Sequence, residues 1–321
     1  VCLYLLQCLL VPKYASDIKE GAMIKEYYNS EKNHDVLILG DCEVYENIST
    51  VKMWEEYGIT SYIRGSSEQL IWQSYYLLED TLKYEKPQVV IVNVLAMTES
   101  DAKNEAYNRM TLDGMKLSKY KIASIRESMT EEENMASYIF PLLRYHSRWS
   151  ELSSEDFRYM WKTPSVTTNG YLMQKGVRPV KTIPKAAPLA NYTFSDRNME
   201  YLDKIYSLCK DNGINLVLMK APSVYPHWYD EWDKQVSDYA YEHGILYLNT
   251  INEAGNIGID YTTDTFDYGQ HLNVEGAEKL SLYLGEQLVK NFRLTDHRQD
   301  ESYKNAWQSI VNKYYEEKQG D

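Results

Sequence analysis

Four short segments carry groups that could act together as a nucleophile, a base and hydrogen-bond donors. Gly40-Asp41-Cys42-Glu43 contains a thiol, Gly65-Ser66 contains a glycine, and Asn93 follows an apolar run. Near the C-terminus, Asp267-Tyr268-Gly269-Gln270-His271 combines a carboxylate with an imidazole. A thiol, a backbone N–H donor, an amide and an Asp/His pair are the groups that acyl transfer through a covalent intermediate requires.

Five short apolar runs supply the elements that would position these groups. They lack polar alternation and are typical of strands buried on both faces of a parallel sheet: Val36–Leu39, Ile59–Ile63, Val89–Val92, Leu216–Met219 and Ile245–Leu248. The first three candidate segments directly follow the first three strands. Because ligands of open parallel sheets bind at the carboxyl ends of the strands, we expect these groups to meet at one edge.

The segments between the strands have helical periodicity. Apolar residues recur at helical spacing in Ser66–Glu85, Ser195–Asn212 and Gly276–Phe292, and Ser195 is a candidate N-cap. Alternating strands and helices predict a doubly wound α/β fold with a five-stranded parallel sheet of the flavodoxin-like kind. About 120 residues between the third and fourth strands break this rhythm and predict a helical insertion at about 99–190 that caps the sheet.

Two clusters outside the four segments are candidates for substrate binding. Arg144, His146 and Arg148 in the insertion could hold an anionic polymer at the same rim of the sheet, or could form a solvated helix face. Trp228 and Tyr229 follow the fourth strand and could stack on a sugar ring, or pack in the core.

Charge and composition exclude several classes of function. With 34 basic and 47 acidic side chains the net charge is −13, which argues against a nucleic-acid partner. Four scattered cysteines form neither a disulfide framework nor a zinc-site pattern, and glycine-rich phosphate loops are absent from the sequence. We therefore expect no metal and no cofactor.

The first residues, VCLYLLQCLLVP, contain no charged side chain. Twelve residues are too few to span a bilayer, which takes about 20. We interpret 1–13 as the outer end of a truncated membrane anchor, which would place the rest of the chain outside the cytoplasm. A signal-peptide remnant and a buried helix are the alternatives. We expect a linker or helix at 14–34, a main domain at 35–293 and a charged tail at 294–321.

With these segments in place, the sequence resembles the SGNH (GDSL) hydrolase superfamily between Asp35 and Phe292, apart from the insertion. The nearer resemblance is to membrane-anchored, extracytoplasmic members that act on cell-envelope polymers beside a membrane-bound O-acyltransferase, such as the teichoic-acid D-alanylation protein of the Dlt system and the alginate acetylation proteins. Their closing pattern, His-Leu-Asn-x-x-Gly-Ala-x-Lys, matches His271 to Lys279.

The resemblance implies an esterase or O-acyltransferase acting on a cell-envelope glycan or a teichoic-acid-like polymer. It implies Cys42 as the nucleophile, His271 as the base and Asp267 as its orienting acid, with the Cys42 and Gly65 N–H groups and Asn93 as oxyanion donors.

Two departures from the family pattern keep an alternative open. Cys42 stands where the family has Ser, and Asp267 lies four residues before the histidine instead of three, so Asp264 could take its place. A thiol beside a histidine at a helix N-terminus is expected to have a lowered pKa, which would make Cys42 competent. The alternative is a catalytically silent glycan-binding or scaffold protein of a cell-envelope acylation complex.

Overall fold

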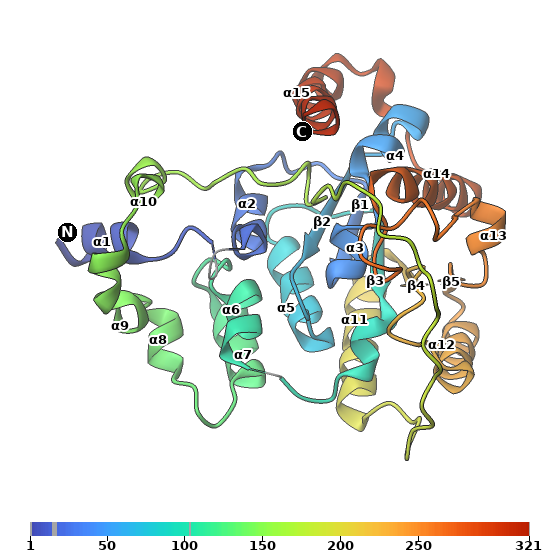
Figure 1. Cartoon of the computed structure of the whole chain (residues 1–321), viewed down its shortest axis with the longest axis horizontal. Helices are drawn as coiled ribbons and strands as arrows, with labels where there is room; N and C mark the ends of the chain where they lie inside the picture. The colour runs from blue at the N-terminus through green and yellow to red at the C-terminus, as the bar shows by residue number, and fades with distance from the viewer. Residues whose placement is uncertain (1, 15–17, 103, 321) are drawn as a thin grey trace.

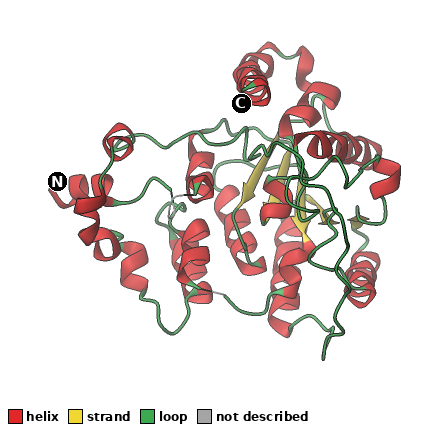
Figure 2. Ribbon diagram, in the orientation of Figure 1, coloured by secondary structure: helices red, strands yellow, loops and turns green. Residues whose placement is uncertain are grey.

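The computed structural model describes residues 2–14, 18–102 and 104–320. Residues 1, 15–17, 103 and 321, which fall in the expected anchor, linker, insertion and tail, lie outside the described residues. The chain builds an α/β fold in which helices surround a twisted sheet (Figures 1 and 2).

All five predicted strands are present and pair in parallel. They are β1 (Val36–Gly40), β2 (Ser61–Gly65), β3 (Val89–Asn93), β4 (Asn215–Lys220) and β5 (Leu246–Asn249), in the spatial order β2-β1-β3-β4-β5. This is the flavodoxin-like order, in which the strand order reverses between β1 and β3 and ligands bind at that reversal. The predicted fold class is therefore confirmed.

The sheet is buried on both faces because alternate strand residues serve two cores. Leu37, Leu39, Val90 and Val92 pack into one cluster with α5 (Ile71–Thr81), α11 (Asp196–Asp211) and α12 (Asp230–His243). Val36, Ile38, Val89 and Ile91 pack into the other with α4 (Thr50–Tyr57) and α14 (Val274–Asn291). Side chains alternate with period two along a strand, so a continuous apolar run covers both faces.

Helix boundaries follow the capping signals in the sequence. The Ser195 hydroxyl accepts a hydrogen bond from the Asn198 N–H at the start of α11, as the N-cap prediction requires. At the start of α14 the Asn273 side chain accepts from Gly276 N–H. The tail helix α15 (Glu301–Gln319) lies within the segment expected as a charged tail.

Between β3 and β4 the chain forms short helices and then an extended loop. The helices are α6 (Glu105–Leu112), α7 (Lys119–Ser128), α8 (Met135–Ile139), α9 (Leu142–Tyr145) and α10 (Ser154–Arg158). The remaining α-helices are α1 (Cys2–Leu10), α2 (Met23–Glu26), α3 (Cys42–Tyr45) and α13 (Ala254–Ile257). Among the described residues, no helix has both the length and the apolar character needed to cross a membrane.

Candidate active site

The turn from β1 into α3 places Cys42 at the first position of a helix. The Asp41 side chain caps this helix by accepting the Glu43 N–H at 3.1 Å. Gly40 leads into the turn, and a Cβ at this position would come within 2.8 Å of the Asn93 Cβ. Glycine is therefore required where β1 and β3 approach each other, directly beneath the candidate nucleophile.

A closed polar network lies behind Cys42, made of Glu43, Asn93 and Lys220. Lys220 at the end of β4 has no exposed surface, and its ammonium donates to both Glu43 carboxylate oxygens at 2.7 and 2.9 Å. It also donates to the Ala221 carbonyl and the Ser223 hydroxyl. A buried ammonium whose partners are all in place is stable, whereas one left without a partner would be costly.

Asn93 belongs to the same network. Its Nδ2 donates to Asp41 Oδ1 at 3.2 Å and to Glu43 Oε2 at 3.0 Å, and its Oδ1 accepts the Ala221 N–H at 3.3 Å. Both amide protons are thus taken by carboxylates. The oxyanion role expected for Asn93 is not open to it in this arrangement, because an oxyanion would have to displace one of them.

His271 is held by two carboxylates. Its Nδ1 lies 2.6 Å from Asp267 Oδ2 and 3.2 Å from Glu46 Oε2, and Asp267 Oδ1 also accepts the His271 backbone N–H at 2.8 Å. The ring nitrogen Nε2 has no hydrogen-bond partner within the described part of the chain. This geometry orients the imidazole and leaves Nε2 available to exchange a proton.

Asp264 does not orient the histidine. Its carboxylate binds the Lys279 ammonium at 2.6 Å and accepts the Asp260 N–H at 2.8 Å. The spacing of four residues therefore does not prevent Asp267 from reaching His271.

Burial and neighbouring charges shift the protonation of this site. Burial alone would lower the pKa of His271, but its hydrogen bond to Asp267 and the charge of Glu46 outweigh burial and raise the pKa to about 9. Burial raises the pKa of Glu46 to about 7, and burial together with the charge of Glu43 raises the pKa of Asp41 to about 7. At neutral pH His271 is a cation.

The lowered pKa expected for Cys42 is wrong. Burial raises the pKa of this thiol well above its usual value, and the charges of Asp41, Glu46 and Glu43 raise it further. The short helix and the histidine do not compensate for this surrounding negative charge. Cys42 is therefore a neutral thiol at physiological pH.

Glu46 links Cys42 and His271: its N–H donates to the Cys42 carbonyl at 3.1 Å, and its carboxylate lies 3.2 Å from His271 Nδ1. Within the described residues, however, no hydrogen bond joins the Cys42 Sγ to the imidazole. Gly65 closes β2 opposite Gly40, and a Cβ on it would meet the Gly40 carbonyl at 3.0 Å and the Tyr45 ring at 3.1 Å. The predicted segments therefore do converge at the carboxyl edge of the sheet.

The arginine cluster of the insertion lies elsewhere, which corrects the expectation that it shares this rim. Arg148 binds the Leu10 carbonyl at 3.0 Å and Asp156 at 2.7 Å, and Arg144 binds Glu105 at 3.2 Å. His146 lies beside the Leu143 carbonyl. Figure 1 shows α9 beside α1, well away from α3 and the sheet.

Trp228 and Tyr229 follow β4 but are engaged by the protein. Trp228 is 8% exposed, packs in the core and donates from Nε1 to Asp233 at 3.3 Å. The Tyr229 hydroxyl binds the Ala187 carbonyl, and its ring packs edge-on against Trp232 with 4.7 Å between centroids. Of the two roles considered for Trp228 from the sequence, sugar stacking and core packing, the structure shows core packing.

Sequence reasoning did not identify Glu43, Glu46 and Lys220. A lysine at the end of the buried run Asn215–Lys220 was a usable signal, because such a lysine needs a carboxylate partner. Glu46 carries no comparable signal, since its role depends on a histidine 225 positions away in the sequence.

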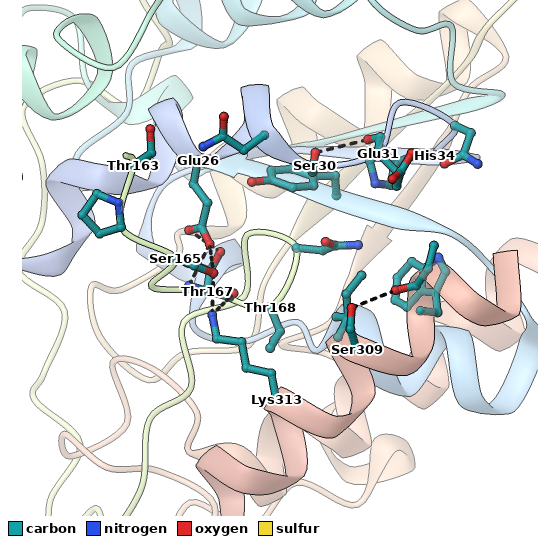
Figure 3. Close-up of a pocket in the computed structure, with 18 residues that line it drawn as sticks. Glu26, Ser30, Glu31, His34, Thr163, Ser165, Thr167, Thr168, Ser309 and Lys313 are labelled. Atoms are coloured by element: carbon teal, nitrogen blue, oxygen red, sulfur yellow. Dashed lines mark hydrogen bonds between the residues drawn. The ribbon is translucent and has the colours of Figure 1, made fainter. Parts of the chain in front are cut away.

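A cavity of about 450 Å³ lies at a different place, between α15, the segment around Glu26 and the loop at 163–169 (Figure 3). Glu26 accepts hydrogen bonds from Ser165 and Thr167, and Lys313 donates to the same two residues. These charged groups are satisfied by the protein itself. Within the described ranges, no group of three or more His, Cys, Asp or Glu side chains could hold a metal ion.

No protein-family model matches this chain, and no curated protein sequence matches it either. A solved structure described as a lipolytic protein of the G-D-S-L family, from Desulfitobacterium hafniense, is 12% identical with a TM-score of 0.39, over 80% of this chain and 100% of that chain. One described as an acylhydrolase, from Bacteroides fragilis, is 11% identical with a TM-score of 0.40, over 87% and 98%. A GDSL-like lipase from Bacteroides thetaiotaomicron is 11% identical with a TM-score of 0.40, over 85% and 100%.

Proposed function

We propose that this protein hydrolyses or transfers acyl esters through a covalent thioester on Cys42, with His271 as the base and Asp267 as its orienting acid. The observation that carries the proposal is the position of His271. Its Nδ1 is fixed by Asp267 at 2.6 Å and its Nε2 is unpartnered among the described residues, beside a helix that begins at Cys42. An oriented imidazole with a free ring nitrogen is one part of what base-assisted nucleophilic catalysis needs, and the contact between Nε2 and the Cys42 Sγ would have to form in the complex with substrate.

The reaction would start from a neutral imidazole. Nε2 takes the proton of the Cys42 thiol as sulfur attacks the ester carbonyl, and then gives it to the leaving alcohol, which forms the thioester. Water or a sugar hydroxyl attacks the thioester, His271 accepts its proton, and the thiol re-forms. Because the pKa of His271 is about 9, the fraction of active enzyme would rise as pH increases towards 9.

We propose a cell-envelope polysaccharide as the acyl carrier, at the extracytoplasmic face of the membrane and beside a membrane-bound O-acyltransferase. The support for this is the sequence resemblance in the closing pattern from His271 to Lys279 and the apolar N-terminal segment.

The test is acyl-adduct formation with p-nitrophenyl acetate between pH 6 and pH 10. Intact-mass spectrometry should detect one acetyl group on the wild-type protein above pH 8, and none on Cys42→Ala. Cys209→Ala is the matched control, because Cys209 is a buried thiol on α11 and its loss should leave the adduct in place. A folded wild-type protein that forms no adduct and releases no nitrophenol at any pH would overturn the proposal.

A second candidate is a silent glycan-binding or scaffold protein at the same location. Two observations favour it: the Cys42 thiol has a raised pKa, and the Asn93 amide protons are already committed to Asp41 and Glu43. In this case an O-acetylated glycan would bind with equal affinity to the wild type and to Cys42→Ala, and Cys42→Ser would gain no esterase activity.

A further inference from the structure

Large apolar side chains are exposed at high density between α8 and the turn after α10. Their exposed fractions range from 58% to 71%, and they lie close together in the sequence: Phe140, Leu143, Trp149, Phe157 and Trp161. Single exposed apolar residues are normal on a protein surface, but a concentration of large ones marks a contact surface.

Helix α1 lies beside these side chains. It contacts α9, α10 and the 3₁₀ segment at His146–Glu151, and Arg148 donates to the carbonyl of Leu10 at 3.0 Å. Leu3 and Leu6 on α1 are 71% and 46% exposed. Figure 1 shows α1, α8, α9 and α10 gathered at one end of the molecule. We call the five side chains of the insertion, together with Leu3 and Leu6, the insertion surface.

The insertion surface lies in a segment that is less acidic than the chain as a whole. Residues 140–162 contain four basic side chains and three acidic ones, whereas the whole chain has a net charge of −13. One of those acids, Asp156, is neutralised by Arg148 at 2.7 Å. Arg158 and Lys162 remain exposed next to Phe157 and Trp161. A bilayer containing anionic lipid would repel most of this protein, but would not repel this segment.

We propose that the insertion surface rests on the lipid bilayer, with its aromatic side chains at the level of the headgroups. Tryptophan and other amphipathic aromatic side chains concentrate at membrane interfaces, where flanking Lys and Arg reach the headgroups. A short apolar helix with exposed leucines can lie in the same plane. This inference rests on the membrane location in the proposed function. It requires no catalysis by Cys42.

In this arrangement the insertion would position the rest of the protein relative to the membrane. Figure 1 shows the insertion helices at the opposite end of the view from α12 and α13. A protein resting on α1 and α8–α10 would hold the carboxyl edge of its sheet away from the lipid, where a polymer in the cell envelope could reach it.

The experiment is vesicle flotation of the whole chain, with vesicles of phosphatidylcholine alone and with one-third phosphatidylglycerol. The test variant carries Trp149→Ser, Phe157→Ser and Trp161→Ser. The matched control is Tyr241→Ser, which removes a ring that is 89% exposed on α12, outside the insertion surface. Circular dichroism verifies that every variant is folded.

The wild type and the Tyr241→Ser control should float with both kinds of vesicle. The triple variant should have a partition coefficient at least ten-fold lower, and should lose any vesicle-induced blue shift of tryptophan fluorescence. Equal flotation of the triple variant, or no flotation of the wild type, overturns the proposal. So does self-association of the wild type that the triple variant abolishes while vesicle binding persists, because the surface would then bind a second copy. Ester hydrolysis, measured in parallel, tests the proposed function separately.

Discussion

The two sides of helix α3 differ in how completely their polar groups are satisfied. On the side of α3 that faces β3 and β4, Glu43, Asn93 and Lys220 form a closed network in which every charged group has its partners. On the side of α3 that faces His271, the side chains of Cys42, Glu46 and His271 have shifted pKa values. The Nε2 atom of His271 has no hydrogen-bond partner among the described residues. A satisfied network stabilises one geometry, whereas groups with strongly shifted pKa values are the ones that can take part in proton transfer.

The largest expected effect comes from breaking the closed network. Lys220→Met leaves Glu43 buried without a counter-charge, and should lower the free energy of unfolding by about 3–5 kcal/mol. Chemical denaturation measures this loss. The double variant Glu43→Gln, Lys220→Met removes both charges and should recover much of it. If Lys220→Met alone is as stable as the wild type, the network is not the structural support of the site.

On the side of α3 that faces His271, His271→Ala should affect activity more than stability. Loss of a general base should lower kcat for p-nitrophenyl acetate by about 10²- to 10⁴-fold. The melting temperature should also fall at pH 6, where the charged imidazole stabilises the folded state, and should change less at pH 10. His146→Ala is the control, because His146 is an exposed imidazole in the insertion. Equal rates for the two variants would remove His271 from the mechanism.

Glu46→Gln should give a smaller change, seen as a shift along the pH axis. This change removes the negative charge 3.2 Å from Nδ1 that stabilises the imidazolium. The pKa of His271 should therefore fall by about one pH unit from about 9. The pH–rate profile should move to lower pH by the same amount. NMR titration of the His271 ring checks the pKa without any substrate, and an unchanged ring pKa would exclude Glu46 from this role.

The stability that His271 contributes has a defined sign. Its folded-state pKa is raised above the unfolded value of 6.5, so the contribution is complete below pH 6.5 and is lost as pH rises through about 9. Glu46→Gln should therefore reduce the difference in melting temperature between pH 6 and pH 10.

An exposed ion pair should contribute the least to stability and can be compared with the buried Glu43–Lys220 pair. Lys234 pairs with Asp238 one turn later on α12, and these side chains are 73% and 55% exposed. Lys234→Ala should cost about 0.5 kcal/mol or less, because solvent screens such a pair. A loss close to that of Lys220→Met would mean that burial does not account for the difference between the two lysines.

The sheet could be predicted from the sequence because its signal is local. A run such as Val89–Val92 is apolar without alternation, and both faces of the strand are indeed buried. The closing pattern is also explained locally: Asn273 caps α14, a Cβ on Gly276 would come within 2.6 Å of the Asp264 carbonyl oxygen, and Lys279 binds Asp264. Most of that pattern therefore builds the helix start, and His271 is its only member in the proposed proton transfer.

The electrostatics of the site could not be predicted, because they depend on distant pairings. The sequence places Cys42 at a helix start, but it does not show the burial and the surrounding carboxylates that raise the pKa of its thiol. It also gives no reason to connect Glu46 with His271. The position of Arg144 was predicted wrongly for a related reason. The helical part of the insertion packs beside α1, and only its loop reaches the sheet edge, where Gln174 donates to Glu46 at 2.6 Å and the Arg178 N–H donates to the Thr265 carbonyl at 2.9 Å.

The pairing of β3 with β4 has a consequence for how the chain folds. Asn93 and Asn215, which begin and end this crossover, are separated by the whole insertion, and the Glu43–Lys220 contact spans 177 positions. Closing so long a loop costs entropy before any contact repays it, and high contact order slows folding. The half of the sheet formed by β1, β2 and β3 can assemble first, whereas the floor of the site forms only when β4 docks. Acquisition of the Glu43–Lys220 pair should therefore coincide with the final cooperative step of folding.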